Sequence, residues 1–185
     1  MGKLTYGMIM SLDGFVADAS DYFDDEVLGF INDETRKYST EIYGRRMYEE
    51  MVYWETYQVE KGATGFADEF ARIWKGFDKL VISSTLERTS SDKTRLLREF
   101  QPDEIRRLKA ESAKDISVAG PTLAAQFIKA GLVDEYALYS VPAILGAGNP
   151  VFKGFEARLD LDLIEDRRFA SGMAFLRYTP RNGGK

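Results

Sequence analysis

The chain has 185 residues, a net charge of −5 and 44% apolar residues, and it contains neither cysteine nor histidine. The length suits one domain with its own core, and the negative charge argues against general nucleic-acid binding. Without these two residue types the sequence excludes disulfides, thiol nucleophiles, imidazole bases and Ser-His-Asp triads, and it disfavours structural zinc. Hydride transfer with a cofactor is therefore favoured, while carboxylate-only chemistry stays possible.

The amino-terminal part predicts a strand, a helix and a second strand. Residues 4–10 are rich in apolar side chains and precede an Asp-Gly turn, which predicts a buried strand. This apolar run is too short for a signal peptide or a membrane span, so we expect a cytoplasmic protein without membrane contact. Asp24 or Asp25 can cap a helix that continues to about Tyr38, and a short strand over 41–43 follows.

The middle of the chain alternates helices and strands. Residues 45–53 and 66–74 have helical apolar spacing, and the KLVIS run at 79–83 predicts a buried strand. Residues 86–95 are polar and are predicted to be irregular. A proline at position 102 and the acidic residues after it predict a helix over 102–112.

The carboxy-terminal part predicts a strand-helix-strand unit and then a hairpin. The unit spans residues 116–150, and such a connection is almost always right-handed and joins parallel strands. Segments 159–168 and 173–178 predict an antiparallel hairpin at an edge of the sheet. We therefore expect an α/β fold with a mostly parallel sheet, in one domain over 1–180, and a flexible tail over 181–185.

Gly44 follows a predicted strand and permits a tight turn into the next helix. Arg45 and Arg46 begin that helix, where side-chain charge and the helix dipole attract an anion. These residues suit a phosphate. A plain turn followed by a solvated basic helix start explains them as well.

Two further strand ends carry residues that suit a nucleotide. Hydroxyls of Ser83, Ser84 and Thr85 can hold a ribose or a phosphate, or they can cap their own loop. Gly120 lets the backbone approach a ligand just before a helix with Pro121 in its first turn. An ordinary turn is the alternative, because the full dinucleotide fingerprint is absent.

Acidic residues and a glycine loop complete the candidates. Asp13, Asp24 and Asp25 can relay a proton beside a hydride transfer, or they can serve as turn caps and solvated surface. Gly146 and Gly148 flank a bend that can contact a substrate or be a plain turn between strands.

Taken in order, these motifs resemble the dihydrofolate reductase-like fold. Within it they are most similar to the C-terminal reductase domain of the bifunctional riboflavin-biosynthesis enzyme of the RibD type. The matching segments cover almost the whole chain: 11–17, 44–49, 79–86, 118–123, 131–135 and 142–152.

This resemblance implies a three-layer α/β/α fold and an NADPH-dependent reductase that forms a homodimer. Its small-molecule substrate would be a pyrimidine- or pteridine-type heterocycle, as for 5-amino-6-(5-phosphoribosylamino)uracil reductase. NADH is a less expected cofactor, although Ser84 stands where many relatives carry Arg. A non-catalytic nucleotide-binding protein on the same fold and a dihydrofolate reductase are the alternatives.

The resemblance also implies roles for individual residues. Cofactor contacts are implied for Ala17, Gly44, Arg45, Arg46, Ser83, Ser84, Thr85, Gly120, Pro121, Thr122 and Leu123. Substrate contacts are implied for Ser11, Gly14, Leu145, Gly146 and Gly148. Asp13 and Asp24 are the expected catalytic carboxylates, and no metal is expected.

Overall fold

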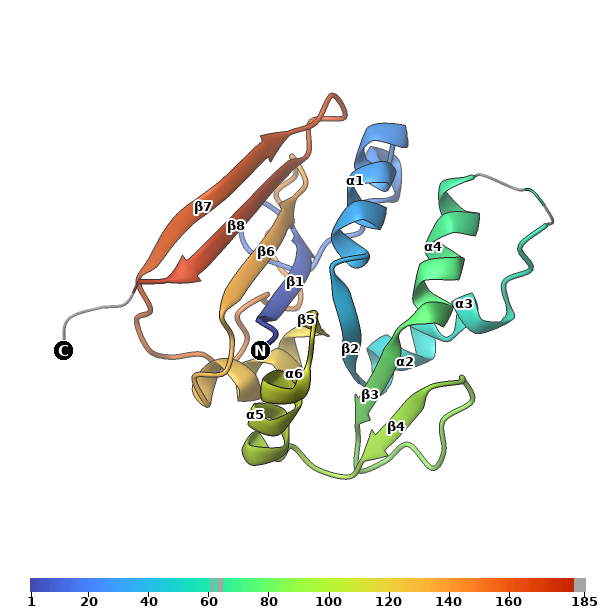
Figure 1. Cartoon of the computed structure of the whole chain (residues 1–185). Coiled ribbons are helices and arrows are strands. Elements are labelled where there is room, and N and C mark those ends of the chain that lie inside the picture. The colour runs from blue at the N-terminus through green and yellow to red at the C-terminus, as the bar shows by residue number, and fades with distance from the viewer. Residues whose placement is uncertain (61, 63–64, 182–185) are drawn as a thin grey trace.

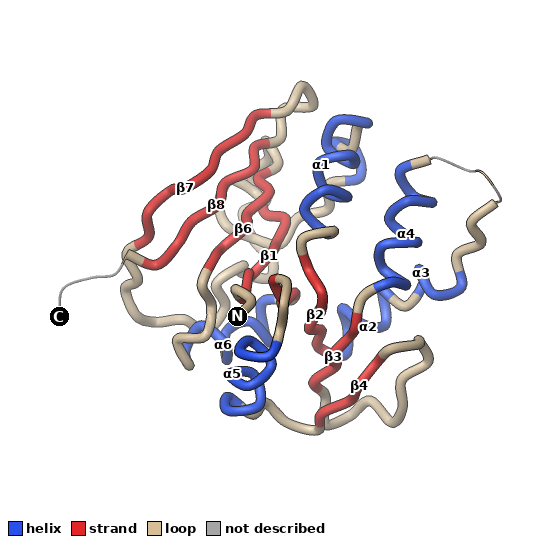
Figure 2. Tube along the Cα trace, in the orientation of Figure 1, coloured by secondary structure: helices blue, strands red, loops and turns tan. Residues whose placement is uncertain are grey.

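The computed structural model describes residues 1–60, 62 and 65–181. An eight-stranded sheet has the order β4-β3-β2-β5-β1-β6-β8-β7 (Figure 1). The strands are β1 Leu4–Met10, β2 Tyr38–Gly44, β3 Asp78–Ile82, β4 Thr94–Leu97, β5 Asp115–Ala119, β6 Glu135–Ser140, β7 Leu161–Arg168 and β8 Ala174–Pro180. The helices are α1 Asp25–Thr35, α2 Arg45–Met51, α3 Tyr53–Thr56, α4 Phe66–Gly76, α5 Pro102–Glu111 and α6 Pro121–Lys129, and Ser20–Tyr22 forms a 3₁₀ turn (Figure 2).

Strand directions confirm the expected sheet. The strands from β4 to β6 pair in parallel, whereas β8 pairs antiparallel with both β6 and β7. The hairpin formed by β7 and β8 lies at one edge, as predicted. Of the predicted tail 181–185, all but Arg181 lies outside the described residues.

Helices cover both faces of the sheet, which confirms the three-layer architecture. Successive side chains of a strand point to opposite faces. On β2, Ile42 packs in a cluster with side chains of α5 and α6, while Tyr43 packs in another cluster with side chains of α2. The indole nitrogen of Trp74 on α4 donates to the Tyr43 hydroxyl, so α4 covers this second face, and α1 packs against α4.

The strand-helix-strand unit of β5, α6 and β6 has the predicted parallel strands, but they are not neighbours. The first strand of the chain lies between them, because Thr5 pairs with Ser117 on β5 and with Glu135 on β6. β1 is therefore a central strand, and both its faces lie under helical layers.

Two predicted helix ends were wrong, and one strand was missed. α1 ends at Thr35, and Tyr38 begins β2 instead of extending the helix. Aromatic and hydroxyl-bearing residues at 38–40 favour the strand, and pairing with β5 is available to them there. The second helix ends at Met51. The strand that was missed is β4, a short and partly exposed edge strand. It begins within the region predicted to be irregular, 86–95, and ends two residues after it.

Among the described residues, no helix is long and apolar enough to span a membrane.

Candidate active site

The carboxyl ends of five parallel strands meet at one edge of the sheet. The strand order β3-β2-β5-β1-β6 places the following segments along that edge in turn: 83–86, 44–46, 120–123, 11–17 and 141–150. Ligands of open α/β sheets bind beyond such ends. The sheet therefore brings together the predicted loops that are far apart in the sequence.

Asp13 joins the first loop to the glycine loop after β6. Its carboxylate accepts from the Ser11 hydroxyl at 2.6 Å and from the backbone amides of Leu145 at 3.1 Å and Gly146 at 2.7 Å. The Ser11 hydroxyl and these two amides lower the pKa of Asp13 to about 2. The amide of Gly14 donates to the Ser11 carbonyl at 3.0 Å and closes the turn. Asp13 is thus ionised at neutral pH and fixes two loops relative to each other.

Replacing Asp13 with Asn is expected to loosen the glycine loop. The amide keeps one acceptor oxygen, so it cannot accept all three hydrogen bonds. We expect the Leu145 and Gly146 amides to exchange with solvent deuterium several-fold faster, measured by hydrogen exchange. Asp18→Asn is the matched control, because the exposed Asp18 accepts local hydrogen bonds from Ser20 and from the Ala19 amide and does not contact the glycine loop in the described structure. Unchanged protection at 145–146 would contradict the role of Asp13.

Backbone contacts extend the junction between the same two loops. The Val16 amide donates to the Asn149 carbonyl at 2.9 Å. At Gly148, φ is +149°, and an added Cβ would lie 3.3 Å from the Cβ of Phe15. The close approach of the two backbones therefore favours glycine at this position.

Ala17 and Asp24 lie further along the first loop and take part in local structure. The Ala17 amide donates to the Ile9 carbonyl at 3.3 Å and returns the chain to β1. The Asp24 carboxylate accepts from the Val27 amide at 2.8 Å and caps α1. The helix cap, which the sequence left open, is the contact that this carboxylate makes.

Two basic residues stand at the start of α2. The Arg45 guanidinium lies 3.3 Å from the Thr85 hydroxyl and donates to Glu49 at 2.7 Å. Arg46 is exposed, and within the described residues its side chain has no ion pair. The loops after β2 and β3 thus present cations and a hydroxyl side by side.

The hydroxyl of Ser83 is used within its own loop. It accepts from the amides of Thr85 at 3.2 Å and Leu86 at 3.0 Å, and Ser83 is buried. This arrangement is the self-capping alternative weighed from the sequence. Ser84 and Thr85 are exposed, so they are the hydroxyls of this loop that stand toward solvent.

Gly120 begins α6 with an open backbone. Its φ is +92°, and the position of an added Cβ meets no atom within 4 Å. Pro121 and Leu123 are buried, and Leu123 lies against Gly44, where an added Cβ would be 3.7 Å from the Leu123 Cβ. Thr122 is exposed. The Leu123 side chain is buried, so Leu123 could contact a ligand only through its backbone.

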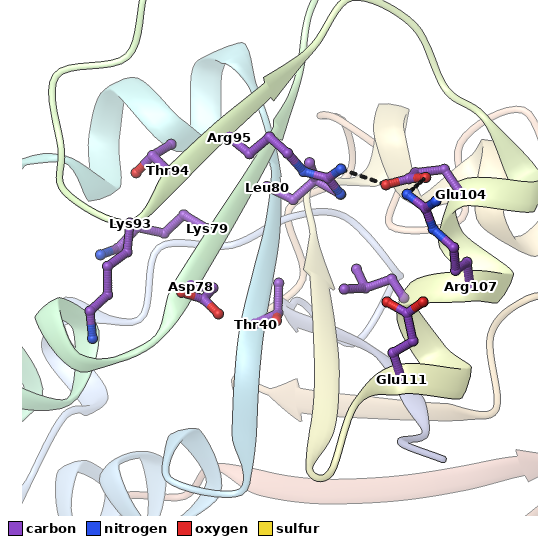
Figure 3. A pocket seen from close by; sticks show the side chains of 11 residues that line it. Thr40, Asp78, Lys79, Leu80, Lys93, Thr94, Arg95, Glu104, Arg107 and Glu111 are labelled. Atoms are coloured by element: carbon purple, nitrogen blue, oxygen red, sulfur yellow. Dashed lines mark hydrogen bonds and ion pairs between the residues drawn. The ribbon is translucent and has the colours of Figure 1, made fainter.

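A hollow of about 490 Å³ lies on the sheet at its other end, near the amino ends of β3 and β4 (Figure 3). Its lining residues come from β2, β3, β4 and α5 and from Lys93 just before β4. Arg95 and Arg107 both form ion pairs with Glu104. The charges that line the hollow there are therefore already paired with each other. It shares no residue with the strand ends described above, so we do not assign the candidate site to it.

A model of the RibD C-terminal domain family matches residues 2–175 of the chain. The chain belongs to this family.

One relative and several solved structures are similar to this RibD C-terminal domain along most of its length. The uncharacterized protein YyaP of Bacillus subtilis is 27% identical over 181 residues, which are 95% of this chain and 94% of that protein. A putative riboflavin biosynthesis protein of a Shewanella species is 19% identical, with a TM-score of 0.72 over 97% of this chain and 99% of that chain. Acinetobacter baumannii RibD is 18% identical, with a TM-score of 0.68, and the match covers 98% of this chain but 59% of that one. The structural matches show the shared fold, and the family supports a reductase-like function.

Sequence reasoning missed one side chain of this RibD C-terminal domain. Glu41 stands inside β2, a central strand, and is only half-buried. Burial raises its pKa to about 7, although hydrogen bonds from Ser117 and Tyr43 lower it in part. The available signal was a carboxylate directly before Ile42 and Tyr43, in a strand that ends at the proposed phosphate turn.

Proposed function

We propose that the chain is an NADPH-dependent reductase that transfers hydride to a pyrimidine- or pteridine-type heterocycle. The observation that carries this proposal is the open backbone of Gly120, which lies between the end of β5 and the start of α6. The neighbouring strand β2 ends at Gly44, directly before Arg45. A glycine turn before a helix, with cations beside it, suits a dinucleotide diphosphate. Family membership supports the same class of reaction.

The residues at this edge fit such a cofactor, which supplies the hydride when bound. Free amides in the first turn of α6 would hold the diphosphate, because the first N–H groups of a helix have no intrahelical partner. Arg45 and Arg46 would meet further phosphate charge, and Ser84 and Thr85 would contact the ribose. Two exposed cations favour NADPH, which carries one more phosphate than NADH.

The substrate would lie on the β1 side of the cofactor. The loop contacts of Asp13 would hold Ser11, Gly14 and the glycine loop around it. Because Asp13 is ionised at neutral pH, its proposed part is to position these loops and not to donate a proton. Asp24 would act through the start of α1.

NADPH is expected to stabilise the protein against heat. At a concentration of 100 Kd, binding to the folded state adds about 2.7 kcal/mol to the free energy of unfolding. The test is the rise in Tm with NADPH and with NADH. Arg45→Ala and Arg46→Ala should reduce the NADPH shift more than the NADH shift, whereas Arg106→Ala, an exposed cation on α5, should change neither. No shift with either nucleotide would overturn the proposal.

A non-catalytic nucleotide-binding role is the second candidate. It is favoured by the local contacts of both predicted carboxylates, since Asp13 holds backbone amides and Asp24 caps a helix. A panel of pyrimidines and pteridines, dihydrofolate included, separates the two roles. NADPH oxidation with any of them would favour the reductase. The homodimer and the cytoplasmic location stay predictions.

A further inference from the structure

A row of polar side chains crosses the middle of the sheet. Thr5 on β1 pairs with Ser117 on β5, Ser117 pairs with Glu41 on β2, and Glu41 pairs with Lys79 on β3. Register partners in parallel strands share a face, so all four side chains lie on one side. Tyr43, two residues after Glu41, shares this face and receives the hydrogen bond from α4. Central parallel strands are normally apolar on both faces, so the polar row needs a reason.

Open space lies directly beside this row, toward the carboxyl ends of the strands. The next row on the same face contains Gly7, Ala119 and Tyr43. An added Cβ at Gly7 would meet no atom within 4 Å, and both Gly7 and Ala119 are partly exposed. A flat group therefore has room over Gly7, one row from the polar side chains toward the carboxyl ends of the strands.

Neighbouring charges leave the Glu41 carboxyl without a partner cation. The Lys79 ammonium turns away, 4.2 Å from the centre of the Trp74 ring, and donates to the Asp92 carbonyl at 3.3 Å. Its closest carboxylate is Glu55 on α3, at 4.0 Å. Within the described part of the chain, Glu41 forms no salt bridge.

The other ionisable groups near Glu41 are tyrosines and a neutralised acid. Tyr38 and Tyr43 share its strand, and the carboxylate contributes to the raised pKa of both hydroxyls. From α1, Glu34 is held by Arg177 and Lys37. Tyrosines with raised pKa values are neutral near pH 7. Glu41 is thus the group of this cluster whose charge changes near neutrality.

Thr5 gives an independent sign of a missing partner. Its hydroxyl oxygen is fully buried and, among the described residues, makes no hydrogen bond of normal geometry, although the Tyr38 hydroxyl lies near enough to interact with it. Buried hydroxyls are normally bonded, because an unsatisfied one costs about 1–3 kcal/mol. The Thr5 hydroxyl and the Glu41 carboxyl, which has no partner cation, lie in the same row. Together they indicate that a ligand with polar atoms along one edge can bind there.

We propose that Glu41 is a substrate-recognition residue whose protonated carboxyl binds the cis-amide edge, N–H beside C=O, of a heterocycle lying over Gly7. A protonated carboxyl offers one donor and one acceptor, which matches this edge, and the Thr5 and Ser117 hydroxyls complete the polar floor. This inference rests on the proposed reductase function and names the chemical edge that its substrate presents.

The test measures binding of 6-aminouracil to the full chain by calorimetry, with saturating NADP⁺. The proton occupancy of a group with a pKa near 7 falls from about nine-tenths at pH 6 to about one-tenth at pH 8, so wild-type affinity should fall roughly tenfold. Glu41→Gln also offers a donor and an acceptor, so it should keep the affinity at pH 6 and lose the pH dependence. Glu41→Leu should bind at least roughly tenfold more weakly at pH 6.

Two controls make the outcome decisive. 6-Amino-1,3-dimethyluracil lacks ring N–H groups, so residue 41 should not change its binding. Glu111→Gln, on exposed α5, should behave like wild type. No wild-type binding of 6-aminouracil, or equal pH profiles for wild type and Glu41→Gln, would overturn the assignment even if Glu41→Leu fails to fold. If NADPH raises the Tm but the pH profiles of wild type and Glu41→Gln are equal, only this inference is wrong. If NADPH does not raise the Tm, the proposed function is wrong as well.

Discussion

Replacing Arg177 with Met is expected to lower the free energy of unfolding by about 3–5 kcal/mol. The buried guanidinium on β8 donates to Glu34 on α1, to Glu135 on β6 at 3.1 Å and to Glu165 on β7 at 2.9 Å. Methionine fills a similar volume but leaves two buried carboxylates without their shared cation. Lys37 and Lys3 also contact these carboxylates, but from exposed positions. The loss should therefore remain large.

Urea unfolding at pH 7 measures this loss against a matched variant. Arg181 follows the same strand and pairs with Asp162, but both side chains of that pair are about half exposed. Arg181→Met should therefore cost less than about 1 kcal/mol. If the two variants were equally stable, the buried network would not be what joins α1 to the carboxy-terminal hairpin.

Glu41 should make the folded protein less stable as the pH rises toward 8. Its pKa is about 7 in the folded state and 4.5 ordinarily, so between these values the folded state holds a proton that the unfolded state has released. The contribution of the Glu41 proton to the free energy of unfolding is therefore fully present below about pH 4.5, and it is lost as the pH rises through 7. The expected loss from pH 5 to pH 8 is about 2–3 kcal/mol. The chain has no histidine, so no imidazole titrates in this window.

Glu41→Gln is expected to remove this dependence. The variant should match wild type near pH 5 and exceed it by about 2–3 kcal/mol at pH 8, because a neutral amide has no charge to desolvate. Chemical unfolding at several pH values measures the difference, with Glu111→Gln as the control on the opposite helical layer. Parallel pH profiles for wild type and Glu41→Gln would show that the carboxyl is solvated in the folded protein.

Local patterns predicted most of the fold. β1 was placed with its observed bounds and α5 within one residue of its observed end, because apolar spacing and a proline mark them. β4 was missed because it is stabilised by pairing with β3 and not by an apolar pattern of its own. The insertion of β1 between β5 and β6 is likewise a long-range property that no local window contains.

The candidate site was predicted in part for the same reason. Loops at strand ends can be located from turn residues, and parallel strands bring these loops to one edge of the sheet. The contacts of Arg45 with Thr85 and of Asp13 with Gly146 were not predicted and are seen only in the structure. The hydrogen bonds that a side chain makes in the folded protein cannot be predicted from turn residues. The sequence shows that Ser83 has a hydroxyl, but not that two amides of its own loop occupy it. Glu41 was missed because its significance comes from neighbours on β1 and β5.

The central position of β1 sets the order in which this chain can fold. Leu4 pairs with Ile116, and Thr5 pairs with Glu135, so the middle of the sheet closes only after most of the chain is present. Joining such distant segments costs loop-closure entropy before their contacts repay it, and a high contact order slows folding. During synthesis the first strand must therefore wait, with its apolar residues uncovered, until residues beyond 135 have emerged.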